Sequence, residues 1–275
     1  KNVVAKDAAV KPFKVIIEDE KACARYSGLV IEGVQVKESP NWLKNKLNAI
    51  GVRSINNIVD ITNYILHETG QPLHAFDAHQ IKDATVVVKK YPAGTLFVTL
   101  DGTERKLTAN DLMISDTEKP LCIAGVFGGI KSGVSAATTS IFLESAWFEN
   151  IHVRKTSLHH GLRTDAATRF EKGVDIAGTV NVLERAAQLI QELAGGKCSE
   201  VVDVYPAPAT KKTVVLTYAY LKKLSGKSYP TDKVKTILTS LGFDLIKETA
   251  ESIEVAVPYH KPDISLPADL VEEVL

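Results

Sequence analysis

RSINNIVDITNYILHETGQPLHAFD, residues 53–77, is the stretch from which the organisation of this chain is best understood. An apolar helix pattern over residues 55–66 is interrupted by five polar side chains, namely Asn56, Asn57, Asp60, Thr62 and Asn63. Gly70 and Pro72 then break the helix, and this pattern predicts that His74 lies in a turn. A polar helix face followed by a histidine held in a turn is typical of a pocket wall. A surface helix with ordinary caps is the alternative interpretation.

The bulk composition is that of an ordinary globular protein. The chain has 275 residues, of which 45% are hydrophobic and 24% charged, enough for one large domain and a small one. Lys and Arg number 33, as do Asp and Glu, so the net charge is zero and no bulk basic field attracts nucleic acid. Any contact with RNA is therefore expected from local patches.

The cysteines and the apolar runs indicate the cellular compartment expected for this chain. Cys23, Cys122 and Cys198 form no CxxC pair, so they fit neither a disulfide framework nor a zinc site, and they suit a reducing cytosol. We expect them to be small buried residues. No apolar run approaches the roughly 20 residues of a membrane span, and we expect no signal peptide at the start of the sequence. The start at Lys1 and the uncapped helix pattern at Leu275 indicate a piece of a longer polypeptide.

Sequence periodicity predicts an α+β domain in the first three quarters of the chain. Helices are expected at residues 40–51, 53–66, 150–158, 166–171 and 177–193. Alternating or β-branched runs predict strands at 13–18, 26–34, 85–90, 95–100, 105–108, 112–115, 121–126 and 140–146. Asp101-Gly102 is a strong hairpin signal. The prediction is a large mixed, mostly antiparallel sheet with flanking helices.

A small second module is predicted after a proline-rich linker at residues 205–209. Helices are expected at residues 218–224, at 231–241 with Thr231 as cap, and from Pro267 onward, with a strand at 253–257. This pattern favours a winged-helix-like α+β module spanning residues 208–275 after a domain of residues 1–207. Its early lysines are either a solvated face or a nucleic-acid patch: Lys211, Lys212, Lys222, Lys223 and Lys227.

Four ordered motifs resemble the β chain of bacterial phenylalanyl-tRNA synthetases. They are NIVDITNY…GQPLHAFD (57–77), IAGVFGG (123–129), HGLRTDAATRFEKGVD (160–175) and PADLVEEV (267–274). Together they extend over most of the chain and are far more specific than a lone glycine pattern. The chain is identified as a member of this family, with an editing domain at 1–207 and the following small module truncated at its C-terminus.

The resemblance implies that this piece of the ligase removes tyrosine wrongly attached to tRNA(Phe). A pocket that accepts Phe cannot strongly reject Tyr, whereas a second pocket that hydrogen-bonds the hydroxyl can. The implied partners are tRNA(Phe) and the synthetase α chain in a cytoplasmic α2β2 assembly. ATP would bind only at the aminoacylation site of the α chain, and editing would need no cofactor. A non-catalytic RNA-binding or assembly module and a stand-alone deacylase are the alternatives.

Candidate site residues come from both the pattern and the resemblance. Glu144 is a carboxylate in the apolar strand pattern IFLESAWF, where a buried position needs a partner and an outward position is the alternative. The resemblance makes Glu144 the residue that reads the tyrosine hydroxyl. It places Ala124 and Gly125 beside the amino acid, and Thr164 and Ala166 in a further wall. It assigns the ester and terminal adenosine end of the site to Thr62, Asn63 and His74.

Hydrolysis of an aminoacyl ester needs little machinery because the ester is already activated, and the sequence shows no nucleophile motif. We expect His74 and Asn63 to position water and ester, with the Gly125 N–H as oxyanion donor. Whether His74 is a general base or only a positioning group stays open at this point. The glycines of GVFGG lack the GK[ST] ending of a phosphate loop, and a strand bulge is the alternative explanation for them.

An acidic cluster near the C-terminus is a candidate metal site. Three of its four carboxylates share one face of the last predicted helix, and oxygen ligands of this kind suit Mg²⁺. The resemblance implies a magnesium site shared with the α chain. A solvated helix start, where acids favour the helix dipole, is the alternative. The four candidate ligands are Asp263, Asp269, Glu272 and Glu273.

Overall fold

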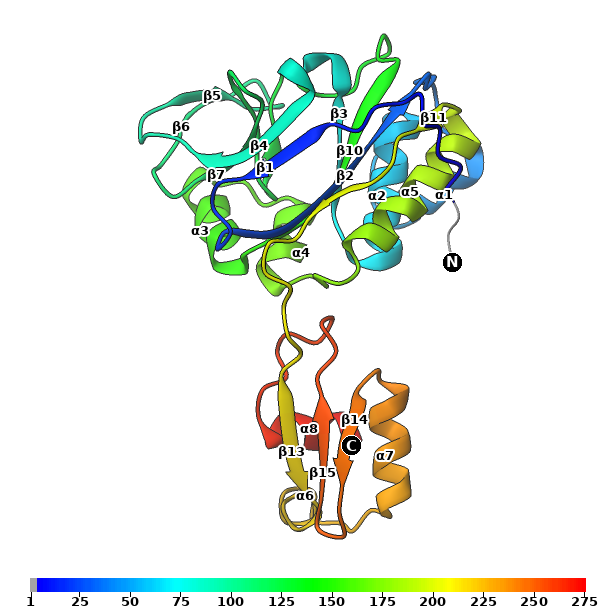
Figure 1. Cartoon of the computed structure of the whole chain (residues 1–275), viewed down its shortest axis with the longest axis vertical. Helices are drawn as coiled ribbons and strands as arrows, with labels where there is room; N and C mark the ends of the chain where they lie inside the picture. Colours follow the sequence, from blue (N-terminus) through cyan, green and yellow to red (C-terminus); the bar gives the residue numbers. More distant parts are fainter. Residues whose placement is uncertain (1–3) are drawn as a thin grey trace. The chain divides into compact units, whose positions relative to one another are not determined.

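The structure of this protein is a computed structural model that describes residues 4–275. The chain divides into two compact units, Lys1–Ala207 and Pro208–Leu275 (Figure 1). Each unit has its own hydrophobic core, two clusters in the larger and one in the smaller. No helix in the described part of the chain is long and apolar enough to cross a bilayer.

Two sheets form the larger unit. The first has the order β11-β2-β10-β3, with β12 also paired to β2, and all its pairs are antiparallel. The second has the order β1-β4-β7-β8-β9, in which only β1 and β4 are parallel. A small ribbon pairs β5 with β6. The first sheet contains β2 (Cys23–Glu32), β3 (Leu73–Asp77), β10 (Ser140–Phe148), β11 (Lys197–Cys198) and β12 (Val202–Val204).

The remaining strands of the larger unit are β1 (Lys14–Ile17), β4 (Thr85–Lys90), β5 (Leu96–Val98), β6 (Glu104–Lys106), β7 (Leu112–Ser115), β8 (Pro120–Ile123) and β9 (Phe127–Gly128). The predicted α+β class with mostly antiparallel pairing is confirmed. The strands are divided between sheets rather than joined in one, as is usual when a twisted sheet would approach ten strands.

The helices of the larger unit form two groups. One group is α1 (Asn41–Ala49), α2 (Asn57–Thr69) and α5 (Thr179–Ala194), in which α2 contacts α1, α5 and β3, and α5 covers β2 and β10 (Figure 1). The other group is α3 (Asn150–His160) and α4 (Asp165–Lys172), which pack on each other. Two single turns, η1 (Ala78–Gln80) and η2 (Lys82–Ala84), precede β4.

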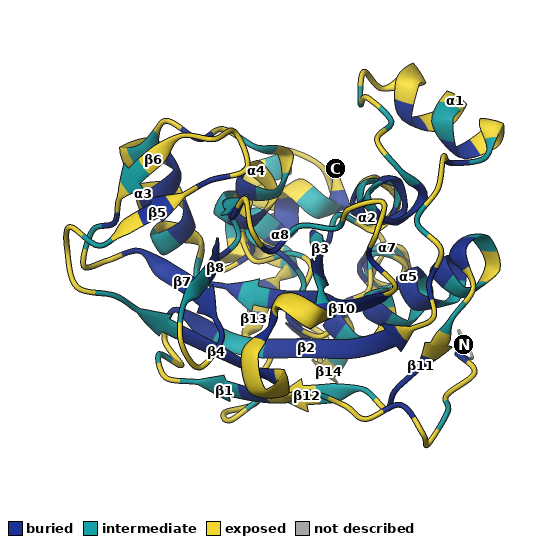
Figure 2. Ribbon diagram, turned by 90° about the horizontal axis from the view of Figure 1, so that it is seen from above, coloured by how far each residue is buried: buried dark blue, intermediate teal, exposed yellow. Residues whose placement is uncertain are grey.

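The central strand β10 contributes side chains to two different cores. Ile141 and Leu143 belong to the cluster that includes α2 and α5, while Phe142 and Ala146 belong to the cluster shared with the second sheet. Successive side chains of a strand point to opposite faces, so Glu144 lies on the face of Phe142 and Ala146. Figure 2 shows β2 and β10 buried along most of their length, as two covered faces require.

The smaller unit is an antiparallel three-stranded sheet with three helices. The strand order is β13-β15-β14, and the apolar positions of strands and helices close one core. The elements are β13 (Thr213–Thr217), α6 (Tyr218–Ser225), α7 (Thr231–Ser240), β14 (Asp244–Glu248), β15 (Ser252–Ala256) and α8 (Pro267–Val274). The expected small α+β module is confirmed, and its sheet has three strands where the sequence predicted one, at residues 253–257.

Three local predictions need correction. Helix α2 starts at Asn57 rather than at residue 53, because the Asn56 side chain accepts hydrogen bonds from two backbone N–H groups of the first turn and fixes the start there. His74 lies in strand β3, not in a turn, because the left-handed Gly70 completes the turn four residues earlier. Thr231 does not cap α7: the cap position is Pro230, which offers no side-chain acceptor.

Candidate functional site

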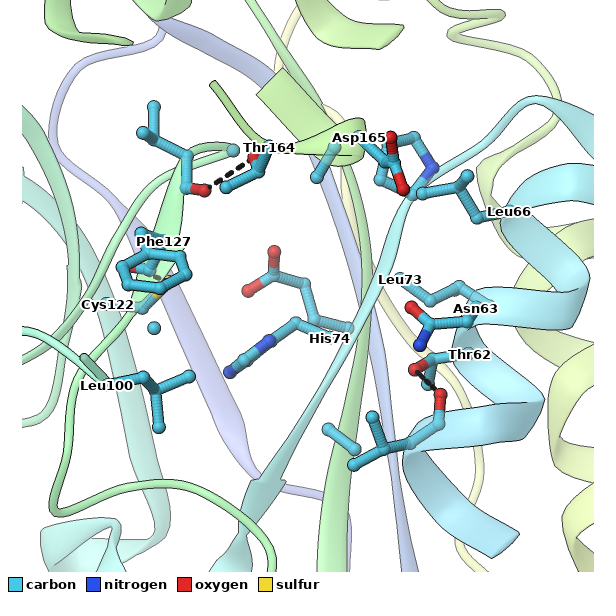
Figure 3. A pocket seen from close by; sticks show the side chains of 18 of the residues that line it. Thr62, Asn63, Leu66, Leu73, His74, Leu100, Cys122, Phe127, Thr164 and Asp165 are labelled. Carbon is cyan, nitrogen blue, oxygen red and sulfur yellow. Dashed lines mark hydrogen bonds between the residues drawn. The ribbon is translucent and has the colours of Figure 1, made fainter. Parts of the chain in front are cut away.

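A cavity of about 480 Å³ lies in the larger unit, within the 300–1,000 Å³ range of ligand sites (Figure 3). Its walls come from α2, from β3 and β10, from the turn between β8 and β9, and from the start of α4. Segments far apart in the sequence therefore meet there. Seven of the eight non-metal residues predicted for the site line it: Thr62, Asn63, His74, Gly125, Glu144, Thr164 and Ala166.

One face of α2 forms the first wall. Val59, Thr62, Asn63 and Leu66 are spaced as i, i+3, i+4 and i+7, so their side chains share a helix face. The Thr62 hydroxyl donates a 2.8 Å hydrogen bond to the Val59 carbonyl and is held within the helix. The Asn63 amide makes no hydrogen bond to any residue that the structure describes, and Figure 3 shows it beside Thr62 in the wall. Asn63 is thus the side chain of this wall that is free to contact a ligand.

Glu144 brings a carboxylate into the cavity from the central strand. It is 6% exposed, so the alternative of an outward-pointing side chain is wrong. Its Oε2 accepts a 2.6 Å hydrogen bond from the Tyr26 hydroxyl. Burial raises the pKa of Glu144 to about 7, while the hydrogen bond from Tyr26 opposes that rise. The site therefore contains an acid that changes charge near neutral pH.

His74 lies directly opposite Glu144 in the pairing of β3 with β10. Its ring packs edge-on against Phe76, with 4.3 Å between the ring centroids. Burial lowers the pKa of His74 to about 4, so the imidazole is neutral at pH 7. Its Nε2 is enclosed and has no hydrogen-bond partner among the described residues. A base with so low a pKa is weak near neutrality, so this environment favours a positioning role.

The turn between β8 and β9 forms the wall that faces α2. Gly125 has φ 67°, and a Cβ there would lie 3.0 Å from the rings of Phe148 and Phe170. Both the backbone conformation and the space therefore require glycine. Because this residue lies between the two strands, the alternative of a bulge within a strand is wrong. Its N–H donates no hydrogen bond within residues 4–275 and is available to a ligand.

The N-terminus of α4 forms the remaining wall, with Asp165 and Ala166 lining the cavity. The Thr164 hydroxyl donates to the Val126 carbonyl at 2.9 Å and accepts from the Ala167 N–H at 3.0 Å. Thr164 therefore caps α4. Its hydrogen bond to the β8–β9 turn, a dashed line in Figure 3, ties the start of the helix to that turn.

Ala124 does not line this cavity, which corrects its predicted place. Its N–H continues the sheet by donating to the Leu112 carbonyl at 2.9 Å. The residue is buried and borders a separate small void with Phe148 and Val153. The turn at Gly125 reverses the chain immediately after Ala124, so only the glycine reaches the cavity.

Several residues of the site escaped prediction. Tyr26 follows the strand pattern of β2 and is fully buried, and a buried phenol usually needs a partner for its hydroxyl. That need was the one signal in the sequence that could have indicated a polar partner across the sheet. The cavity-lining residues Leu100, Cys122 and Phe127 belong to strand patterns that carry no chemical signal (Figure 3).

The four predicted magnesium ligands do not come together. Asp269 accepts from the backbone N–H groups of Ser265 and Leu266 and caps α8, while Glu273 pairs with Lys261 at 2.7 Å. Within the part of the chain that the structure describes, no three His, Cys, Asp or Glu residues are placed to hold a metal ion. These contacts give Asp269 and Glu273 local structural roles, and a magnesium site shared with another chain stays a prediction.

Comparison with protein-family models places the chain in a class of synthetase-associated domains. Residues 22–195 match the model of the B3/4 domain, and residues 214–275 match that of the tRNA synthetase B5 domain. The chain belongs to the B3/4 domain family, with a B5 domain after it.

Curated relatives agree with this assignment. The chain is 53% identical over 264 residues to the phenylalanine–tRNA ligase beta subunit of Bacteroides fragilis, covering 96% of this chain and 32% of the relative. The beta subunits of Porphyromonas gingivalis and Carboxydothermus hydrogenoformans are 49% and 45% identical, over 96% of this chain and 32% and 33% of their own lengths. The predicted family resemblance is confirmed, and the chain spans about a third of the length of these relatives.

A solved structure also matches, the crystal structure of an N-terminal fragment of the phenylalanyl-tRNA synthetase beta-subunit from Pyrococcus horikoshii. It is 16% identical with a TM-score of 0.44, and the match covers 100% of this chain and 76% of that one.

Proposed function

We propose that this chain is part of the β subunit of a phenylalanine–tRNA ligase and that its cavity hydrolyses tyrosine misattached to tRNA(Phe). The family match and the curated relatives support the first part. The observation that carries the second is the buried Glu144 carboxylate inside a cavity large enough for a ligand. The tRNA, an α chain bearing the ATP site, and a cytoplasmic location belong to the same proposal.

Specificity in this proposal rests on the second carboxylate oxygen of Glu144. Oε2 is engaged by Tyr26, whereas Oε1 accepts no hydrogen bond from any described residue. A tyrosine side chain that enters the cavity can donate its phenol O–H to Oε1. A phenylalanine in the same place leaves this buried oxygen unpaired, which disfavours its binding.

Hydrolysis then follows from groups arranged around the ester. Water attacks the carbonyl carbon, and the bond from that carbon to the ribose oxygen breaks. The ribose oxygen takes up one proton of the attacking water, the other proton is released to solvent, and tyrosine leaves as the free carboxylate. The free Gly125 N–H stabilises the negative charge that develops on the carbonyl oxygen. Asn63 and the neutral His74 hold water and ester in place. No step passes through a metal ion.

The test is deacylation of Tyr-tRNA(Phe) and Phe-tRNA(Phe) by the complete ligase, with and without Glu144→Ala. We expect the unmodified enzyme to clear Tyr-tRNA(Phe) quickly and the variant to lose its preference for Tyr over Phe. Ser145→Ala is the matched control, because Ser145 is the next residue of β10, is buried, and has a hydroxyl without a hydrogen bond. If the unmodified enzyme hydrolyses Tyr-tRNA(Phe) no faster than buffer, the domain is a binding or assembly module.

A further inference from the structure

The hydroxyl of Tyr26 is the donor that reaches Glu144. Tyr26 lies on β2, is 0% exposed, and donates to Oε2 at 2.6 Å. The two side chains lie on the same face, between the two sheets, although 118 residues separate them in sequence. Among the described residues no Lys or Arg pairs with Glu144, so Tyr26 alone fixes the position of the carboxylate.

A stack of aromatic rings holds Tyr26 in place. The ring of Phe142 stacks on Tyr26 at 6.5 Å between centroids and an interplanar angle of 11°, and on Phe13 at 5.5 Å and 9°. Gly28, the β2 residue opposite Glu144, makes room for this stack, because a Cβ there would lie 2.3 Å from the Phe142 ring. The phenol direction is therefore set by packing rather than by the hydrogen bond alone.

We propose that Tyr26 is a positioning residue for specificity, holding one oxygen of Glu144 so that the other is presented to the substrate as an acceptor. This role rests on the proposed editing function and adds a residue that does not itself touch the substrate. A carboxylate with one oxygen fixed can offer the second in one direction only. The same carboxylate without that hydrogen bond can rotate and, near neutral pH, take up a proton and become a donor.

The groups around Glu144 make its charge depend on Tyr26. The titratable neighbours are Cys23 on β2, Cys122 on β8 and His74 on β3, with Asp165 of α4 lining the same cavity. Burial raises the pKa of both thiols, and burial lowers that of His74, so these three groups are neutral at pH 7. The hydrogen bond from Tyr26 is the one contact that lowers the pKa of Glu144.

The experiment compares Tyr26→Phe with the unmodified protein in the complete ligase. It measures the ratio of kcat/KM for Tyr-tRNA(Phe) to that for Phe-tRNA(Phe) between about pH 5.5 and 9, which extends roughly 1.5 units below and 2 units above pH 7. We expect the preference for Tyr to fall by about 10-fold to 100-fold at pH 7, as for loss of a hydrogen bond to a charged group. We also expect the preference for Tyr to depend on pH with a midpoint that is about one pH unit higher in the variant than in the unmodified protein.

Ser27→Ala is the matched control, because it removes a buried hydroxyl from the next residue of β2, on the opposite face. Ser27 bonds to Thr179 and Asp203, not to Glu144. A merely structural role for Tyr26 would make both variants lose activity with an unchanged pH midpoint. Replacing Tyr26 by 3-fluorotyrosine, a stronger donor of nearly the same size, should move the midpoint downward and serves if Tyr26→Phe does not fold.

The outcomes separate the two proposals. If the unmodified ligase clears Tyr-tRNA(Phe) but Tyr26→Phe keeps its preference and its pH midpoint, the role of Tyr26 is wrong and the editing function stands. If the unmodified ligase has no such activity, the editing function is wrong and the role of Tyr26 is overturned with it.

Discussion

Gly125 shows how one residue joins the packing of the core to the chemistry of the cavity. Its positive φ turns the chain between β8 and β9, and its missing side chain leaves room for Phe148 and Phe170. The same residue lines the cavity, and its N–H donates no hydrogen bond to any described residue. The sequence indicated a close backbone approach at this glycine, but not which aromatic rings would enforce it.

Gly125→Ala should lower the free energy of unfolding by about 2–4 kcal/mol, because strain at positive φ adds to overpacking. Gly161→Ala is the control: Gly161 has φ 65° but nothing lies within 4 Å of a Cβ there, so only the strain of about 1–2 kcal/mol applies. Urea unfolding of both variants measures the difference. Equal losses would show that the contact with the two rings has no energetic weight.

At the scale of the element, helix α2 is defined by polar contacts at its start. The Asn56 side chain accepts from the N–H groups of Ile58 and Val59. The buried Asp60 carboxylate accepts from Ser39, Ser54 and the Ile55 N–H, which holds the extended approach to the helix. Two of the polar residues that interrupt the apolar pattern of residues 55–66, Asn56 and Asp60, therefore fix the helix start. Two others, Thr62 and Asn63, lie on the face that lines the cavity.

Asn56→Ala should cost about 1 kcal/mol of stability, the usual value of a lost helix cap. Thr231→Ala provides the comparison at the start of α7, where the threonine side chain caps nothing, and we expect a change below about 0.5 kcal/mol. Thermal unfolding of both variants checks this. A larger loss at Thr231 than at Asn56 would contradict the assignment of the two caps.

The elements themselves were largely predictable from the sequence. Period-two runs and hairpin signals located most strands of the larger unit but only β15 of the smaller one, and apolar spacing with terminal glycines located the helices. The division into two sheets was not predictable, because it depends on which strands pair across long separations, such as β10 with both β2 and β3. The place of Ala124 was missed for the same reason, since only the turn decides which neighbour faces the cavity.

At the scale of the whole molecule, Glu144 and His74 affect stability in opposite ways. The folded protein binds the Glu144 proton more tightly than the unfolded chain, with a pKa of about 7 against 4.5, so this contribution to stability falls as pH rises from 4.5 to 7. His74, with a pKa of about 4 against 6.5, gives a contribution that rises as pH rises from 4 to 6.5. The two slopes oppose each other across pH 4.5–6.5.

Removing either group should reveal the slope of the other. The quantity to compare is the free energy of unfolding of each variant minus that of the unmodified protein. For Glu144→Gln this difference should increase by about 3 kcal/mol as pH rises from 4.5 to 7. For His74→Asn it should increase by a similar amount as pH falls from 6.5 to 4. Urea unfolding across this pH range measures both. Ser145→Ala, which removes no titratable group, should give a difference that is flat with pH. A flat profile for Glu144→Gln would show that the carboxyl titrates normally.

The position of Glu144 on β10 has a consequence for how this protein can change over evolutionary time. Loops tolerate insertions and large substitutions, so a preference encoded in a loop can drift quickly. In the proposed function the discriminating side chain, Glu144, lies on the central strand β10, whose adjacent residues Phe142 and Leu143 belong to two different cores. A one-residue shift of that strand would exchange the two faces and bury the wrong side chains. If the proposed function holds, the choice of amino acid is inherited with the fold, and only single substitutions can change it.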